Sequence, residues 1–214
     1  MALRRSMILL GFALAPAVSM AQFSANFGMV TDYLYRGIYQ EDASASAGLD
    51  YEHDSGFYVG TWGADVGDGL EYDVYGGYGG DIGDSGFGWS AGFTGYYYTD
   101  TFDDTYQEIN GGLTWGGFSL DVAVGEWDGF GVSEDYTFTS IGYEFDGGAY
   151  ITYGDFGDQF TGDYLEVGYG FDFMGLDLSI AVITSDDLVV SGDNPLADYN
   201  LVFGISKGIA IGGE

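Results

Sequence analysis

Residues 176–182 read Leu-Asp-Leu-Ser-Ile-Ala-Val, and residues 118–124 read Phe-Ser-Leu-Asp-Val-Ala-Val. In both stretches every second side chain is large and apolar, and the side chains between them are small, polar or acidic. A period of two predicts a β-strand whose two faces meet different environments. The same alternation recurs along the chain, with turn residues between the segments. It predicts an all-β fold, a closed antiparallel barrel that spans a membrane with lipid outside and a polar lumen inside.

The first 21 residues have the features of an export signal. Arg4 and Arg5 precede a short apolar run, and residues 19–21, Ser-Met-Ala, carry small residues at the two positions that a signal peptidase recognises. We expect cleavage before Gln22, which leaves residues 22–214 as one outer-membrane barrel domain. An uncleaved anchor is the alternative, although the run is short for a membrane-spanning helix.

The expected mature chain is strongly acidic. The whole sequence has 34 acidic and four basic residues, a net charge of −30, and loss of residues 1–21 leaves Arg36 and Lys207 as the only basic ones. This charge argues against nucleic acid as a partner and favours cations. The alternative is a saline habitat, in which acidic residues serve solubility. The sequence has no Cys, so a closed hydrogen-bonded barrel, rather than disulfides, is expected to stabilise the exported chain.

Turn signals divide the chain into twelve predicted strands, an even number as in bacterial single-chain barrels; ten or fourteen are the less favoured counts. The predicted strands are residues 23–35, 43–52, 56–64, 70–79, 86–98, 105–115, 117–126, 135–145, 148–154, 163–173, 175–184 and 197–207. Tight turns rich in Gly and Asp follow every second strand, and mostly longer segments follow the others. Outer-membrane barrels show this asymmetry, with short turns in the periplasm and long loops outside. The alternative, a soluble β-sandwich, does not require it.

Aromatic residues on the apolar parity gather beside the short turns. Amphipathic rings favour a membrane interface, so we expect a girdle at the periplasmic side. Its predicted members are Tyr51, Phe57, Tyr78, Phe87, Trp115, Phe118, Phe145 and Phe171.

Apart from the acids at strand ends that are counted with the outer loops, the eleven acidic residues of the predicted strands all take the polar parity, and a charge that faces lipid is costly. We therefore expect them to line the lumen. Arg36 is the one basic residue on this parity, and we expect it to pair with Asp32 or Glu71 and narrow the pore; a purely structural ion pair is the alternative. Inward Tyr58, Tyr75, Tyr96 and Tyr150 are expected to fill much of the interior. The predicted pore-lining residues are Asp32, Arg36, Asp50, Trp62, Glu71, Asp73, Glu108, Asp121, Glu144, Glu166 and Asp177.

Neither a metal centre nor a catalytic site is predicted. Acidic residues of the predicted outer loops, at 100–104 and 155–163, offer oxygen ligands, but their spacing matches no calcium-binding motif, so diffuse attraction of cations is expected. His53, the only histidine, falls in a predicted solvated turn, and no Cys nucleophile is available. We expect no enzymatic activity and no cofactor.

Three stretches carry a resemblance to a known family. Residues 24–40 (SANFGMVTDYLYRGIYQ), 48–66 (GLDYEHDSGFYVGTWGADV) and 70–78 (LEYDVYGGY) resemble the opening of the TorF-type porin family of proteobacterial outer membranes. The resemblance covers residues 24–80 and implies an outer-membrane β-barrel with a pore role. Its most recognisable elements are Tyr-Leu-Tyr-Arg-Gly at 33–37 and Thr-Trp-Gly at 61–63. Arg36 and Trp62 within them take the inward parity, and we expect them at a constriction.

The sequence therefore predicts a passive diffusion channel in the outer membrane of a Gram-negative bacterium. An acidic mouth and lumen favour small cations, or neutral solutes, as permeants, and outer-membrane lipid is the expected surrounding. The alternative is a non-conducting structural or adhesion barrel that acts through its acidic surface loops, since barrels of this strand number are narrow. The sequence indicates neither a particular solute nor an oligomeric state.

Overall fold

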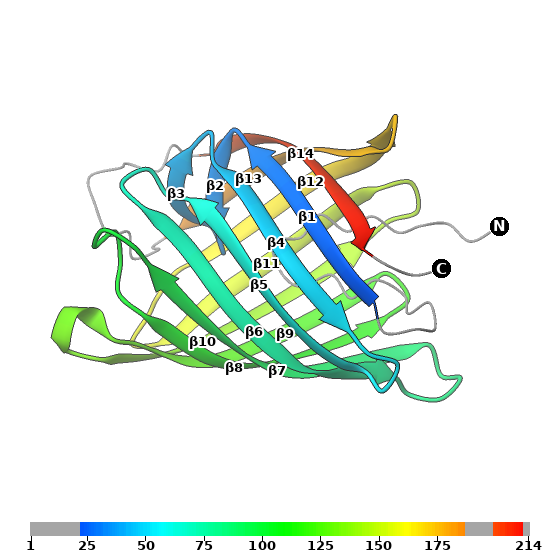
Figure 1. Cartoon of the computed structure of the whole chain (residues 1–214), viewed down its shortest axis with the longest axis horizontal. Helices are drawn as coiled ribbons and strands as arrows, with labels where there is room; N and C mark the ends of the chain where they lie inside the picture. Colours follow the sequence, from blue (N-terminus) through cyan, green and yellow to red (C-terminus); the bar gives the residue numbers. More distant parts are fainter. Residues whose placement is uncertain (1–21, 187–198, 212–214) are drawn as a thin grey trace.

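The computed structural model describes residues 22–186 and 199–211, and their main element is a closed antiparallel barrel of twelve strands (Figure 1). The barrel strands are β1 (Gln22–Val30), β4 (Ala45–Glu52), β5 (Phe57–Asp65), β6 (Leu70–Asp81), β7 (Phe87–Tyr98), β8 (Tyr106–Trp115), β9 (Phe118–Trp127), β10 (Glu134–Glu144), β11 (Ala149–Asp158), β12 (Asp163–Phe173), β13 (Leu176–Asp186) and β14 (Asn200–Ile211). Neighbours in sequence pair along the wall, and β1 closes the barrel by pairing with both β4 and β14. The predicted fold class is confirmed. The predicted signal, residues 1–21, lies outside the described residues.

Three elements stand outside the barrel order. Strands β2 (Asp32–Tyr35) and β3 (Ile38–Asp42) form a separate two-stranded sheet, and η1 (Gly129–Gly131) is a short 3-10 helix. Within the described part of the chain, no helix has the length and apolar character needed to cross a membrane.

The observed strands agree with the predicted ones to within a few residues, with three larger departures. A first strand over 23–35 was wrong beyond Val30, where the chain leaves the wall to form β2 and β3. The ninth predicted strand, 148–154, extends to Asp158 in β11. The last predicted strand, 197–207, extends to Ile211 in β14, where Ile211 pairs with Phe23.

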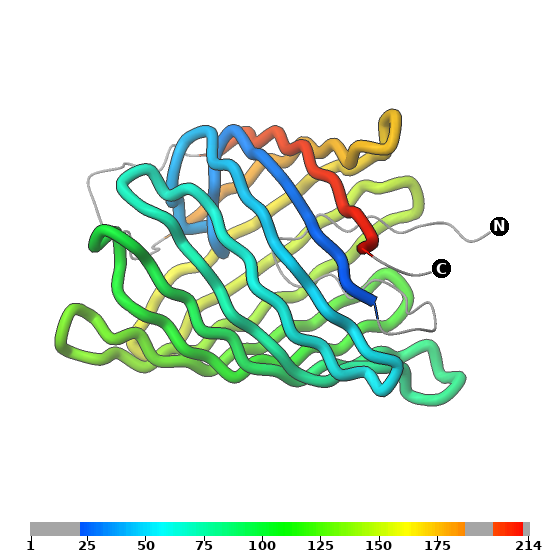
Figure 2. The backbone as a smooth tube through the Cα atoms, viewed as in Figure 1, coloured from blue at the N-terminus to red at the C-terminus, as the bar shows by residue number. Residues whose placement is uncertain are grey.

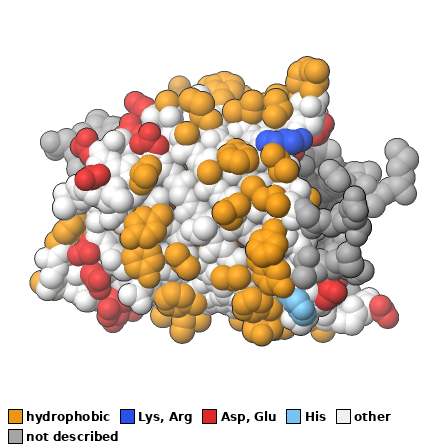
Figure 3. All heavy atoms as spheres, in the orientation of Figure 1, with side chains coloured by type: hydrophobic (Ala, Val, Ile, Leu, Met, Phe, Trp, Pro, Cys, Tyr) orange, Lys and Arg blue, Asp and Glu red, His pale blue; other side chains and the backbone are white. Residues whose placement is uncertain are grey.

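The wall has an apolar outer face. On β9 the outward side chains of Leu120, Val122 and Val124 are exposed, whereas the inward Ala123 between them is buried. Exposed apolar side chains are the expected surface for a wall that meets lipid. Figure 3 shows hydrophobic side chains across the middle of the barrel, with acidic side chains toward both ends of the face in view.

Connections of different length separate the two ends of the barrel. The turns at 53–56, 82–86, 116–117, 145–148 and 174–175 lie at the end where β1 begins and β14 ends, which we call the inner end (Figure 2). The opposite, outer end carries the connections that include β2–β3 and residues 99–105. The predicted alternation is confirmed, although the outer connection over 66–69 is also short.

An aromatic belt surrounds the inner end. The rings of Phe87 and Trp115 stack with their centroids 5.5 Å apart. The ring centroids of Phe118 and Tyr143 are 4.5 Å apart. Each predicted girdle residue takes part in a ring contact near this end. The arrangement has the form of the aromatic girdles by which membrane barrels meet an interface.

At the outer end the strands run further than expected and carry acidic residues on the outside of the wall. Asp155 pairs in register with Asp163, and Asp163 pairs with Asp186 on its other side. The prediction that residues 155–163 form an outer loop was wrong in part, because β11 continues to Asp158 and β12 begins at Asp163. The outer rim is therefore acidic on its outer face as well as in its connections.

Candidate functional site

The segment between β1 and β4 folds into a hairpin. A two-residue turn, Arg36 and Gly37, joins β2 to β3, and both residues have positive φ, 50° and 79°. Positive φ at both positions is the geometry of a type I′ hairpin turn, which Gly tolerates and Arg adopts at a cost. The amide of Ala43 donates to the carbonyl of Thr31 at 2.6 Å and closes the base of the hairpin.

The hairpin lies inside the barrel, at its outer half, and reaches the wall on several sides (Figure 1). Tyr33 Oη donates to Glu71 of β6 at 2.7 Å, and Tyr35 Oη donates to Tyr96 Oη of β7 at 2.8 Å. From β13, Ser185 Oγ donates to the carbonyl of Gly37 at 2.8 Å. Because β6 and β13 are far apart in the barrel order, these bonds show that the hairpin spans the lumen.

An ion pair holds the tip of the hairpin. Arg36 Nη1 and Nη2 each lie 2.9 Å from a carboxylate oxygen of Glu108 on β8, a bidentate geometry. Tyr96 Oη and Tyr136 Oη donate to the same carboxylate, each at 2.9 Å. The guanidinium carbon lies 4.2 Å from the ring centre of Phe138. The side chains of Arg36 and Glu108 are 15% and 1% exposed, so the pair is buried.

The predicted partners of Arg36 were wrong. Asp32 lies at the base of the hairpin, in register with Asp42, rather than in the barrel wall. Glu71 accepts its hydrogen bond from Tyr33. The inward turn at Arg36 moves the guanidinium away from both and toward Glu108.

Apolar packing completes the filling of the outer half. Leu34 of the hairpin is buried in a cluster drawn from β9 to β13, and the ring of Tyr33 lies edge-on to Trp62 with centroids 5.8 Å apart. The buried members of the Leu34 cluster are Ala123, Tyr136, Phe138, Phe156, Tyr164, Ala181 and Ile183. Arg36 and Trp62 thus both lie where the hairpin narrows the lumen.

One carboxylate under the hairpin stands apart from this network. Asp73 on β6 faces inward, in register with Trp62 of β5 and Tyr96 of β7. Its residue is 7% exposed, and its Oδ1 has no hydrogen-bond partner among the described residues.

The lumen is open at two inward positions near the inner end of the barrel. Asp121 takes the inward parity on β9 and is nevertheless exposed. A Cβ placed on the inward Gly208 of β14 would meet nothing within 4 Å. These observations describe an acidic vestibule between the hairpin and the inner end of the barrel.

The remaining predicted pore residues lie on the inward face of the inner half of the barrel or at its boundary. Asp50 accepts hydrogen bonds from Tyr75 Oη and Asn26, and Glu166 accepts one from Tyr150 Oη at 2.6 Å. Glu144 and Asp177 take the inward parity near the inner end and are partly exposed. The role of the whole set in lining a pore stays a prediction.

Two acids of the connection between β7 and β8 have structural partners. Asp103 accepts from Tyr106 Oη at 2.9 Å and from Trp127 Nε1 at 3.0 Å, and Asp104 accepts from the amide of Phe130 at 2.7 Å. In the described ranges, no three acidic or histidine side chains are grouped so as to hold a metal ion.

The turn histidine lies at the inner end. His53 is exposed, with Nδ1 2.9 Å from Ser55 Oγ. A solvated turn of this kind lacks the packing that orients a catalytic base.

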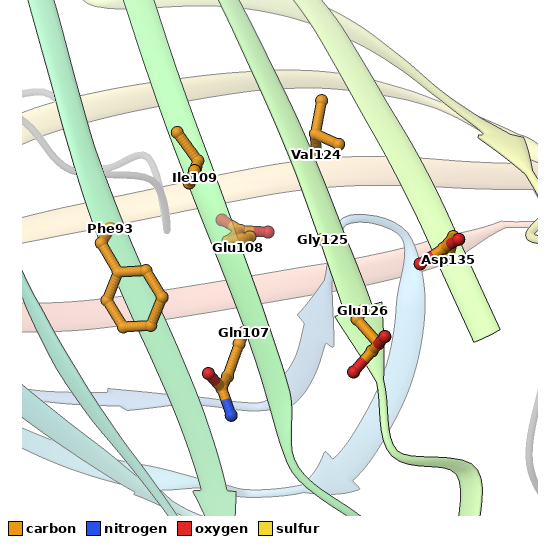
Figure 4. Close-up of a pocket in the computed structure, with 8 residues that line it drawn as sticks. All are labelled: Phe93, Gln107, Glu108, Ile109, Val124, Gly125, Glu126 and Asp135. Atoms are coloured by element: carbon orange, nitrogen blue, oxygen red, sulfur yellow. The ribbon is translucent and has the colours of Figure 1, made fainter. Parts of the chain in front are cut away.

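A shallow depression of about 270 Å³ lies on the outside of the wall over β7 to β10 (Figure 4). Its apolar side is formed by Phe93, Ile109 and Val124, and Glu126 and Asp135 face each other across its polar side. Since outward side chains of these strands form most of its lining, the depression belongs to the outer wall and not to the lumen.

The hairpin and the Arg36–Glu108 pair were not predicted from the sequence. The sequence did contain one signal for the hairpin. Arg36 and Gly37 stand between two short apolar runs, and two residues ending in Gly at such a position favour a two-residue hairpin turn. The prediction placed these residues at the end of a long strand instead.

The closed antiparallel barrel, with its apolar wall and acidic interior, has the fold of solved porins. The chain belongs to the family described as bacterial protein of unknown function (Gcw_chp), whose model matches residues 14–206. This match leaves the TorF-type resemblance a prediction. A search of curated proteins found no match.

Solved structures share the fold. The chain is similar to the KdgM porin, with a TM-score of 0.57, 10% identity, and coverage of 86% of this chain and 98% of that one. The KdgM porin in complex with disordered oligogalacturonate aligns with the same TM-score and coverage at 9% identity. A structure titled "Unveiling the Mechanism Behind the in-meso Crystallization of Membrane Proteins" gives a TM-score of 0.60 at 9% identity, covering 88% and 83%. At these identities the likeness concerns the fold alone.

Proposed function

We propose that this protein is a passive diffusion channel of the bacterial outer membrane for small solutes. The observation that carries the proposal is the division of the lumen into an open acidic vestibule, in which inward Asp121 is exposed, and a constriction made by the β2–β3 hairpin. A constriction set by an inward-folded segment limits the size of the permeant, while the barrel wall supplies the path.

The charge of the lumen favours cations as permeants. Glu144 and Asp177 face the vestibule with Asp121, and the described interior offers Arg36 as its cation, already paired with Glu108. Carboxylates in a narrow, low-dielectric passage raise the local concentration of cations and repel anions. The oligogalacturonate named in the KdgM complex is an acidic saccharide, so this interior gives no reason to carry that ligand over to the present chain.

A second candidate rests on the same hairpin. Tyr33 and Leu34 are almost fully buried, and Arg36 is held by two hydrogen bonds to Glu108. If the hairpin stays in this position, it blocks the lumen. The barrel would then be closed, and the protein would act through its acidic outer rim as a structural or adhesion protein. An enzyme is the least supported of the three, because the acidic groups have structural partners or lie apart from a placed nucleophile and base.

Single-channel recording of the refolded chain in a planar bilayer under a KCl gradient separates the first two candidates. The channel proposal expects discrete steps with a reversal potential on the K⁺ side. A barrel that is folded, by its heat-dependent electrophoretic mobility, and yet shows no steps supports the closed barrel instead.

A further inference from the structure

Three inward carboxylates lie near the hairpin: Glu71 accepts a hydrogen bond from Tyr33, and the other two, Glu108 and Asp73, differ in whether a cation pairs with them. Glu108 receives a guanidinium, Arg36, which lies against the rings of Tyr35 and Phe138 at 4.9 and 4.2 Å. Asp73 receives no cation from the described chain, and its Oδ1 lacks a hydrogen-bond partner there. At Glu108, a carboxylate and nearby aromatic rings bind a guanidinium. At Asp73, a comparable carboxylate has no cation bound to it.

The surroundings of Asp73 have the same chemistry. In register beside it are Trp62 on one neighbouring strand and Tyr96 on the other, and Tyr33 of the hairpin packs on Trp62. A carboxylate between aromatic faces attracts an organic cation by charge and by cation–π contact.

Burial makes the missing partner significant. Asp73 is 7% exposed, and a buried carboxylate oxygen without a partner is costly in free energy. A ligand that donates N–H groups removes that cost, so the site selects donors with positive charge. The grouping needed for a metal ion is not present among the described residues.

We propose that Asp73, with Trp62 and Tyr96, forms a binding site for an organic cation with a guanidinium or primary ammonium group. This inference rests on the proposed channel, because a solute reaches Asp73 through the lumen. It assigns the class of solute: a cation of the same chemistry as Arg36, bound beside the constriction.

Titration calorimetry of the refolded full barrel in detergent micelles tests binding without any need for conductance. The probe is butylguanidinium, and the comparison ligands are its neutral analogue butylurea and K⁺. Asp73→Asn is the test variant, and Asp81→Asn is the control. Asp81 lies on the same strand, β6, at its inner end. We expect butylguanidinium to bind the wild type and the Asp81→Asn control equally, and Asp73→Asn to bind about tenfold more weakly or worse. Butylurea should not bind.

A second variant covers the case in which Asp73→Asn does not fold, which heat-dependent mobility reveals. Trp62→Leu retains the carboxylate and removes the ring, and should weaken butylguanidinium binding about three- to tenfold while leaving K⁺ unaffected. Equal binding to Asp73→Asn and wild type overturns the proposal. So does the absence of binding by any cation, which indicates a protonated carboxyl, or K⁺ binding as tight as butylguanidinium, which indicates an inorganic ion site. Binding of butylguanidinium by a barrel that shows no conductance in the bilayer would contradict the proposed channel function but leave the binding site in place.

Discussion

Arg36 and Glu108 are 72 positions apart in the sequence, yet both Nη atoms of Arg36 lie 2.9 Å from oxygens of Glu108. The pair joins the tip of the β2–β3 hairpin to the barrel wall at β8. Tyr96 and Tyr136 direct their hydroxyl groups at the same carboxylate, so the wall presents a prepared acceptor and the hairpin brings the cation.

Replacement of Glu108 by Gln should loosen the hairpin. Removal of one partner of a buried pair leaves the other charge uncompensated, at a cost of about 3–5 kcal/mol. The chain has no Cys, so a single Leu34→Cys serves as a reporter: it should resist a membrane-impermeant thiol reagent in the otherwise unchanged protein and react at least about tenfold faster with Glu108→Gln.

The control for that experiment is Glu126→Gln, which lies on the outward face of β9. This change should leave the Cys protected. Equal labelling rates with and without the Glu108→Gln change would show that the ion pair does not hold the hairpin in place.

The vestibule acids should govern charge selectivity. Asp121→Asn removes a carboxylate that faces the vestibule, so the ratio of K⁺ to Cl⁻ permeability should fall by about half or more. Reversal potentials under a KCl gradient measure the ratio, and the effect should shrink at high salt because the field is screened. An unchanged ratio contradicts a role for the vestibule charge.

Two inward glycines form a matched pair for a test of wall packing. A Cβ on Gly77 would collide with the carbonyl of Ala91 and lie 2.7 Å from Cα of Gly92, whereas a Cβ on Gly208 would meet nothing within 4 Å. Gly77→Ala should therefore lower the free energy of unfolding by about 1–3 kcal/mol, and Gly208→Ala should have little effect. Urea unfolding in lipid vesicles gives both values. Equal free energies of unfolding for the two variants would mean that Gly77 does not lie as close to Ala91 and Gly92 as this structure shows.

Asp103, in the outer connection between β7 and β8, should make stability depend on pH. Burial raises the pKa of its carboxyl above the ordinary value, even though its hydrogen bonds favour the charged form. The folded state then holds more protons than the unfolded state between the ordinary and the raised pKa, so the stability present below the ordinary pKa is lost as pH rises through that window.

Asp103→Asn removes this component. The loss of stability between pH about 4 and neutral pH should be smaller in the variant than in the wild type. Asp100→Asn, an exposed change in the same connection, is the control. Identical pH dependence in wild type and Asp103→Asn contradicts the argument.

The strands and the faces of their residues could be predicted because a period of two is a local property. Glu71, Asp73 and Glu108 face inward on the strands where the alternation placed them. The hairpin could not be derived in the same way. Tyr33, Leu34 and Tyr35 are good strand formers, and they do form a strand, but its position inside the lumen depends on the distant acceptor Glu108.

The central claim is that the β2–β3 hairpin is the constriction of an outer-membrane channel. Replacement of residues 32–42 by a short glycine linker tests it most directly, because the bond between Thr31 and Ala43 already closes the hairpin's base and the barrel strands stay intact. Single-channel recording should give larger steps than the wild type, with cation preference retained. Steps of the same size, or no steps from a folded barrel of either form, would contradict the account.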